Sequence, residues 1–260
     1  MAIIRSLVII PTYNESENII DLINEIFLLD DNLHILVVDD NSKDKTSNLV
    51  EEKIKVSNNR LFILKRKSKL GLGSAYSDGF KWAFSQNLVN NRITSNQNSK
   101  YEIIFTIDAD FSHNPKDLLR MKVFLAKDGA DVVIGSRYIT GVNVINWPIQ
   151  RVLLSYFGSL YARIVTRVPI MDLTSGFVGY KISVIRNILK KGIEFNGYAF
   201  QIEMKFKAHL LGYKLYEIPI IFTDRVKGNS KMNKSIIPEA IFGILKMKFK
   251  SIFLRNKWNF

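Results

Sequence analysis

The chain has 260 residues, 47% of them apolar, which suits one domain or one domain with an appendage. It has no cysteine, which excludes disulfides, thiolate nucleophiles and zinc–thiolate sites. Its formal net charge of +13 favours a polyanionic partner: nucleic acid, an anionic membrane surface or a phosphorylated substrate. No apolar run reaches the roughly 18 residues of a transmembrane helix, and the N-terminal run is too short for a signal peptide.

Strand and helix patterns alternate over the first 140 residues. The continuous apolar run 7–10 is typical of a strand buried on both faces, and further strands are expected at 34–38, 61–64, 103–107 and 131–136. Helices are expected over 19–27, after 42, from about 74 to 86 and over 115–127. Asn14 and Glu17 have the spacing of a capping box ahead of the first helix. The alternation predicts an α/β fold with a mainly parallel central sheet and flanking helices.

The order changes beyond about residue 145. We expect a long helix over 148–167, a glycine-containing segment over 174–180, a helix over 200–211, a strand over 215–222 and then a basic tail. The polar, asparagine-rich stretch 86–100 fits a surface insertion. We therefore divide the chain into a domain of residues 1–235 and a tail of residues 236–260.

The tail is basic and amphipathic. From residue 225 to the end it carries nine lysines and arginines against one acid, Glu239. Lys246 and Lys250 oppose an apolar helical face, and Lys248 interrupts that face. Its apolar members are Ile237, Ile241, Ile244, Leu245, Phe249 and Ile252. Such a helix either lies in a membrane interface, attracted by anionic lipid, or packs on the domain with a solvated basic face.

The apolar run 103–107 ends in two acids, Asp108 and Asp110, followed by Ser112. A carboxylate at the end of a buried strand is costly unless it is compensated. Mg²⁺ or Mn²⁺ would compensate it, because both prefer carboxylate oxygens and Mg²⁺ usually also takes substrate phosphates. If the strand geometry continues, the three side chains share one side. A turn that caps the next helix at Asn114-Pro115 explains the same residues.

Polar residues stand at the carboxyl ends of four predicted strands. Ligands of parallel sheets bind beyond these ends. The convergence therefore predicts a binding site, formed by Tyr13 and Glu15, Asp39 and Asp40, Asp108 and Asp110, and Arg137.

Three further features have two interpretations each. Arg137 is either a surface charge or a bidentate phosphate clamp. The segment 225–231 is a basic, glycine-containing loop, either a solvated hairpin or a lid over a diphosphate. The stretch 39–42 either caps a helix or accepts hydrogen bonds from a base or ribose.

Eight short motifs are spread over about residues 5–235: 11–15 (PTYNE), 37–42 (VVDDNS), 71–75 (GLGSA), 108–115 (DADFSHNP), 135–138 (GSRY), 172–177 (DLTSGF), 197–204 (GYAFQIEM) and 225–231 (RVKGNSK). In this order they resemble glycosyltransferase family 2, specifically its dolichol-phosphate (polyprenol-phosphate) mannose synthases. The resemblance implies a GT-A type, Rossmann-like fold and an inverting transfer of mannose from GDP-mannose to a polyprenyl phosphate. It also implies Mg²⁺ or Mn²⁺ as cofactor.

The resemblance also implies roles for individual residues. The nucleoside would be held by Pro11, Tyr13, Glu15, Val38 and Asp40. The rest of the donor would be bound by Asp108, Ala109, Asp110, Arg137, Arg225 and Lys231. The metal would lie among Asp108, Asp110 and Ser112, although some relatives have Gln in place of Ser112. The acceptor phosphate would be bound by Arg137, Arg151 and Ser155. Asp110, Arg137 and Arg225 would act in catalysis. Glu203 stands where some relatives carry a catalytic base, but we do not assign that role to Glu203.

Many bacterial relatives carry C-terminal transmembrane helices, whereas this chain ends in the basic tail. Resemblance to the short class implies peripheral attachment to the cytoplasmic face of an anionic membrane. The sequence leaves open whether the chain has a membrane-embedded partner protein. We expect no nucleic acid partner. Two alternatives remain: a UDP-sugar-dependent polyprenyl-phosphate glycosyltransferase, and a basic nucleic-acid-binding protein without catalysis. The second leaves the acids at the strand ends unexplained.

Overall fold

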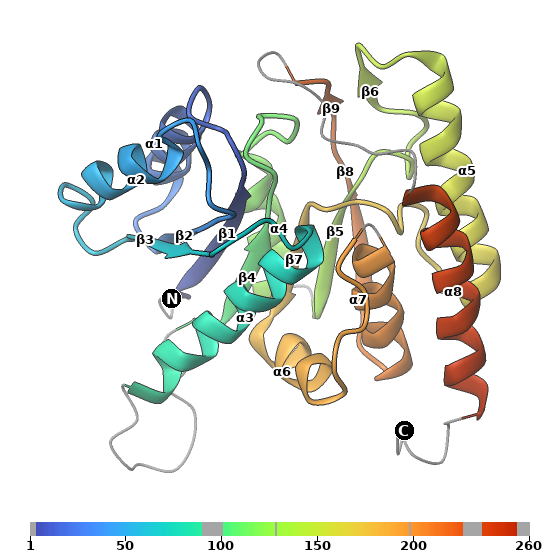
Figure 1. Cartoon of the computed structure of the whole chain (residues 1–260). Coiled ribbons are helices and arrows are strands. Elements are labelled where there is room, and N and C mark those ends of the chain that lie inside the picture. Colours follow the sequence, from blue (N-terminus) through green and yellow to red (C-terminus); the bar gives the residue numbers. More distant parts are fainter. Residues whose placement is uncertain (1–3, 90–100, 128, 198, 226–235, 254–260) are drawn as a thin grey trace.

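The computed structural model describes residues 4–89, 101–127, 129–197, 199–225 and 236–253 (Figure 1). Most of the predicted insertion 86–100 lies outside these residues. The elements follow in the order β1 Ser6–Thr12, α1 Ile19–Leu29, β2 Leu33–Asp39, α2 Thr46–Ile54, β3 Leu61–Lys65, α3 Leu72–Val89, β4 Ile103–Thr106, α4 Asp117–Ala126, β5 Val132–Ser136, β6 Val144–Ile145, α5 Ile149–Thr166, β7 Val178–Lys181, α6 Ile182–Lys190, α7 Ala199–Leu210, β8 Leu215–Pro219, β9 Phe222–Thr223 and α8 Ile236–Phe253.

Seven strands form the central sheet in the order β3-β2-β1-β4-β7-β5-β8. All neighbours pair in parallel except β7, which runs antiparallel to β4 and β5. The predicted α/β fold with a mainly parallel sheet is confirmed.

Two apolar cores lie on opposite faces of this sheet. Alternate residues of β1 show the division: Val8 and Ile10 belong to the core beneath α1 and α4, while Leu7 and Ile9 belong to the core beneath α3, α6 and α7. The strands are thus covered on both sides, which explains why their sequences are continuously apolar.

The strand β7 was not predicted, because its segment is interrupted by glycine. A Cβ on Gly179 would lie only 2.7 Å from Cε1 of Phe105 on the neighbouring β4. Glycine is therefore needed for the close approach of the two strands. Gly179 is thus a closely packed strand residue and not a sign of irregular structure.

The predicted strand 215–222 is two strands. β8 ends at Pro219, and β9 pairs with β6 in a separate two-stranded sheet. A residue of β9, Phe222, also forms a bridge with His113, just after the acid pair. This break carries the chain from the edge of the central sheet to the carboxyl end of β4.

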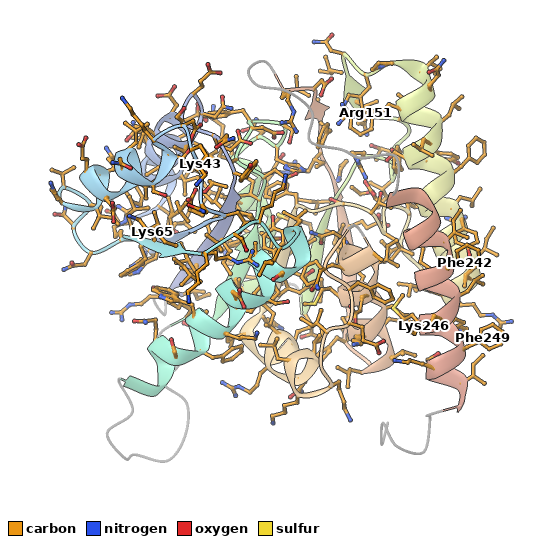
Figure 2. The ribbon with its side chains drawn as sticks, in the orientation of Figure 1. Lys43, Lys65, Arg151, Phe242, Lys246 and Phe249 are labelled. Carbon is orange, nitrogen blue, oxygen red and sulfur yellow. The ribbon has the colours of Figure 1, made fainter. Side chains whose placement is uncertain are left out.

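The C-terminal helix α8 lies against α5 and α7 (Figure 1). Its inward side includes Ile244 and Met247, which are buried, and Gly243, whose missing side chain makes room for the Phe195 ring. Phe242 and Phe249 are 71% and 60% exposed and lie at the outer edge of the molecule (Figure 2). The predicted apolar face is therefore divided: Ile244 packs on the domain, as the second interpretation of the tail expects, while Ile241, Phe249 and Ile252 are exposed. The division of the chain at residue 235 stays a prediction.

Candidate active site

The two acids follow β4 in a tight turn. β4 ends at Thr106, and Phe111 adopts a left-handed backbone with φ of 58°. Asp110 Oδ1 accepts a hydrogen bond from the Ser112 backbone N–H at 3.2 Å. Extended strand geometry therefore does not continue to Ser112, and that part of the prediction is wrong. The turn itself keeps Asp110 and Ser112 adjacent.

The surroundings of Asp108 disfavour its negative charge. Burial, and then the neighbouring Asp110 carboxylate, raise the pKa of Asp108 to about 7, although Arg225 and Arg137 oppose the shift. Its side chain keeps 35% of its surface exposed. An added cation at this point would relieve the repulsion between the two acids.

His113 lies next to the acids as a neutral ring. It packs between Phe177 and Phe222, with ring centroids at 4.9 and 5.0 Å. Burial lowers its pKa to about 4. Its Nδ1 is 4.0 Å from Asp108 Oδ2 and has no hydrogen-bond partner among the described residues. His113 is thus a neutral polar neighbour of the acid pair.

The donor set at the acid pair fits a divalent cation that shares its ligands with a substrate. The described residues contain no cluster of three or more His, Asp or Glu side chains that would hold a metal by themselves. Asp108 and Asp110 supply two carboxylates, and the buried Ser112 Oγ has no hydrogen-bond partner in the described part of the chain. Mg²⁺ commonly takes one or two carboxylates and completes its shell with water and substrate phosphate.

Arg225 reaches the acid pair from the segment after β9. Its Nη2 lies 2.8 Å from Asp110 Oδ2. The preceding residue, Asp224, pairs with Arg151 Nη1 at 2.8 Å. Two of the predicted phosphate-binding arginines are therefore linked through one short segment. Lys231, the other predicted residue of this loop, lies outside the described residues.

Arg137 is held in place by Asp172. Its Nε and Nη2 each donate to a different carboxylate oxygen at 2.7 Å, and Nη2 also donates to Thr174 Oγ1 at 2.8 Å. The backbone N–H groups of Met171 and Asp172 in turn donate to the Glu217 carboxylate. The guanidinium is thus oriented before any ligand binds. Its assignment as a phosphate clamp stays a prediction.

The start of α5 carries the predicted acceptor residues. The Arg151 guanidinium lies 4.1 Å from the centre of the Trp147 ring, and Ser155 follows one helical turn later, half-buried. Figure 2 shows Arg151 near the β6 end of α5. Arg151 and Ser155 therefore share a helix face, while no hydrogen bond joins either residue to Arg137 in the described structure.

The nucleoside-binding prediction falls on two loops that are tied together. Asn14 Oδ1 accepts from the Lys43 N–H at 2.8 Å, and the Glu15 N–H donates to Thr46 Oγ1 at 3.0 Å. Asn14 therefore joins the loops after β1 and β2. The predicted capping box is wrong, because the residue before α1 is Asn18. Pro11 lies near the end of β1, and Lys69 Nζ lies 4.3 Å from the centre of the Tyr13 ring.

The structure separates the roles of the adjacent acids Asp39 and Asp40. Asp39 accepts hydrogen bonds from Thr12, Ser42 and Ser47, so its carboxylate is fully used within the fold. Asp40 accepts one from Arg66 Nη1 at 2.7 Å. Val38 and Ala109, also predicted to touch the donor, are buried. Asp40 is thus the acid of the two with acceptor capacity left for a ligand, and its assignment to the nucleoside stays a prediction.

Glu203 has a structural role. Its carboxylate accepts from the backbone N–H groups of Glu194 and Phe195 and forms an ion pair with Lys207. Both charged side chains are almost completely buried. No sequence pattern indicated these partners, nor Asp172 as the residue that holds Arg137.

Solved structures identify the fold. A glucosyl-3-phosphoglycerate synthase from Mycobacterium tuberculosis, in complex with Mn²⁺, UDP and glucosyl-3-phosphoglycerate, matches with a TM-score of 0.64 at 18% identity, covering 94% of this chain and 80% of that one. A mannosyltransferase from Pyrobaculum calidifontis, in complex with GDP-Man and Mn²⁺, matches with a TM-score of 0.52 at 16% identity, covering 97% and 75%. The chain has the GT-A fold of glycosyltransferases.

The family follows from sequence comparison. The model of glycosyl transferase family 2 matches residues 7–189, and the chain belongs to this family. A polyprenol monophosphomannose synthase from Mycolicibacterium smegmatis is 39% identical over 240 residues, covering 92% of this chain and 85% of the relative. An undecaprenyl-phosphate mannosyltransferase from Micrococcus luteus is 36% identical over 242 residues, covering 93% of each. The resemblance indicated by the motifs is confirmed.

Proposed function

We propose that this glycosyltransferase transfers mannose from GDP-mannose to a polyprenyl phosphate, with inversion at the sugar's anomeric carbon. The names of the two relatives support the mannosyl group and the acceptor. The GDP-Man complex of the archaeal neighbour supports the donor.

The observation that carries the proposal is the juxtaposition of acids and arginines at the carboxyl end of β4. Both substrates are phosphate anions, and bringing them together requires positive charge. Arg225 contacts Asp110, and Arg137 is fixed by Asp172 on the same side. Asp108, Asp110 and Ser112 would hold Mg²⁺ or Mn²⁺, which would neutralise charge on the diphosphate leaving group.

The reaction forms one bond and breaks one. An oxygen of the lipid phosphate attacks the anomeric carbon, and the bond from that carbon to the diphosphate oxygen breaks, releasing GDP. The phosphate nucleophile is already anionic near neutral pH, so the site needs no strong general base. The use of Glu203 within the fold agrees with this. Arg137 and Arg151 would orient the acceptor phosphate, and Arg225 would stabilise charge on the diphosphate.

We also propose that the enzyme acts as a peripheral protein at the cytoplasmic face of a membrane. No helix among the described residues is long and apolar enough to span a bilayer. The helices α5 and α8 lie side by side and expose apolar side chains: Ile149, Leu153, Leu154, Phe157, Ile164, Ile241, Phe242, Leu245, Phe249 and Ile252. Arg151 lies in the first turn of α5, so a lipid phosphate bound there would have its chain next to an apolar surface.

The test is transfer of label from radiolabelled GDP-mannose into organic solvent, with polyprenyl phosphate and Mn²⁺ present. We expect label in the lipid fraction that is lost with EDTA and with Asp110→Asn. The second candidate, a UDP-sugar donor, is favoured by the UDP bound to the mycobacterial neighbour. Transfer from a UDP-sugar alone would replace the donor assignment, and transfer from no donor would contradict the function.

A further inference from the structure

Helix α7 is buried along nearly its whole length, although four of its buried side chains, at alternate positions, are polar. Three of these have partners that explain them. Glu203 and Lys207 form an ion pair with each other, and Lys205 Nζ donates to the carbonyl oxygens of Leu173, Ser175 and Gln201. Buried polar groups are normally satisfied in this way.

The fourth, Gln201, is the exception. Its side chain is 2% exposed, and neither Oε1 nor Nε2 has a hydrogen-bond partner in the described structure. A buried amide without partners costs free energy that a methionine or leucine of similar size would not. The amide is therefore best explained by a ligand that is absent when the protein stands alone.

The position of the amide indicates which ligand. A Cβ on Gly176 would lie 3.4 Å from Gln201 Nε2 and 3.8 Å from Asp108 Oδ1. The missing side chain of Gly176 thus leaves space between the amide and the acid that follows β4. Tyr76 also lies close to Asp108. Its ring stacks on Phe200 with 5.9 Å between the ring centroids. Gln201, Tyr76 and Asp108 thus bring neutral polar groups and one acid together beside the proposed donor site.

We propose that the Gln201 amide binds hydroxyl groups of the donor sugar and so helps to select the sugar. An amide offers two donors and an acceptor, which matches neighbouring sugar hydroxyls. A phosphate would instead require a cation or several N–H groups. The inference rests on the proposed nucleotide-sugar transfer. It adds a residue that binds the sugar and not the nucleotide.

The experiment compares binding of the nucleotide with binding of the nucleotide sugar, using the full chain and Mn²⁺. Calorimetry measures GDP and GDP-mannose on the wild type, on Gln201→Met, which keeps the volume, and on Gln201→Glu, which keeps the shape but loses donors. Gln86→Met is the control. Gln86 lies near the C-terminal end of α3, whereas Tyr76 lies near the start of that helix. Thermal unfolding and kcat/KM are measured in parallel. If only a UDP-sugar is transferred, UDP and that sugar nucleotide replace the GDP pair.

We expect Gln201→Met to bind GDP like the wild type and to lose about 10- to 100-fold in kcat/KM and in its extra affinity for GDP-mannose. Its melting temperature should stay the same or rise, because no internal hydrogen bond is lost. Equal loss of GDP and GDP-mannose affinity would assign the amide to the diphosphate and overturn the proposal. The proposal would also be overturned if Gln201→Met kept the wild-type difference between its affinities for GDP and GDP-mannose. A lower melting temperature that accounts for the lost activity would overturn it too. The binding comparison tests the proposal even if the wild type transfers no sugar.

Discussion

Arg225 forms an ion pair with Asp110 at 2.8 Å, using the carboxylate oxygen that the Ser112 turn leaves available. The guanidinium therefore occupies part of the space that a metal ligated by Asp110 would need. A divalent cation bound there would compete with Arg225 for this carboxylate until a diphosphate offered the arginine another partner. The pair would thus link metal binding to donor binding.

We predict that Arg225→Gln binds Mn²⁺ more tightly than the wild type when no nucleotide is present. Loss of a partly exposed ion pair is worth about 1 kcal/mol, or about fivefold in affinity. The same variant should lose about 100-fold or more in transfer, since it lacks the charge that would stabilise the leaving group. Titration with Mn²⁺ followed by electron paramagnetic resonance measures the first effect, and the radiolabel assay the second.

Arg120→Gln is the matched control, because Arg120 forms a similar ion pair with Asp117 on α4. It should change neither quantity. Weaker Mn²⁺ binding by Arg225→Gln would show that the arginine does not compete with the metal.

We predict that Glu203→Gln destabilises the fold without removing the chemistry. The substitution breaks a buried ion pair and leaves Lys207 without its carboxylate, which costs about 3 kcal/mol or more. Urea unfolding measures this loss, and transfer per folded molecule at low temperature should stay within about threefold. A general base contributes about 100- to 10,000-fold. Activity reduced to that extent in a protein of unchanged stability would make Glu203 the base.

The strand ends could be predicted from the sequence, and the partners of their side chains could not. Continuous apolar runs are enough to assign Asp40, Asp108 and Arg137 to one edge of the sheet, because parallel strands bring their carboxyl ends together. That Asp39 is used inside the fold depends on hydroxyls from two other segments, Thr12 and Ser47. Asp172 contacts Arg137 across 35 positions in sequence, and no local pattern encodes that pairing.

Helix α7 shows the same limit for burial. Its polar residues alternate with apolar ones, which is typical of a half-exposed segment. The structure buries them because carbonyl oxygens and backbone N–H groups from other segments meet Glu203 and Lys205. Charged side chains in a sequence predict solvent-exposed positions unless their interaction partners are known.

We predict that Lys205 makes the stability of the protein depend on pH above neutrality. Burial lowers the pKa of Lys205 to about 7, whereas an unfolded lysine titrates near 10.5. Between these values the unfolded chain binds more protons, so stability rises with pH, by at most about 1.4 kcal/mol per pH unit from this group. Denaturant unfolding at pH 7, 8 and 9 should show a steeper rise for the wild type than for Lys205→Met. Parallel curves would mean that the lysine keeps its charge in the folded protein.

We predict that the exposed phenylalanines of α8 carry membrane binding. Removal of the whole tail is a poor test, because Ile244 and Met247 pack on the domain and their loss would expose its core. The double variant Phe242→Gln, Phe249→Gln leaves this packing intact. It should bind anionic liposomes about 10- to 100-fold more weakly, since each phenylalanine would otherwise leave water for the interface. Its affinity for GDP-mannose should not change.

The control for that variant is Leu28→Gln, a leucine of α1 that is 87% exposed. Helix α1 lies on the opposite side of the molecule from α8 (Figure 1). Flotation with anionic and with neutral liposomes measures both variants. Leu28→Gln should bind like the wild type, and neutral liposomes should bind every form less, because Lys246 on α8 is exposed and would attract anionic lipid. If the double variant floats as well as the wild type, the apolar face of α8 does not meet the membrane. If the leucine control is equally weakened, binding is a general effect of surface hydrophobicity, and the exposed apolar side chains of α5 and α8 have no special role.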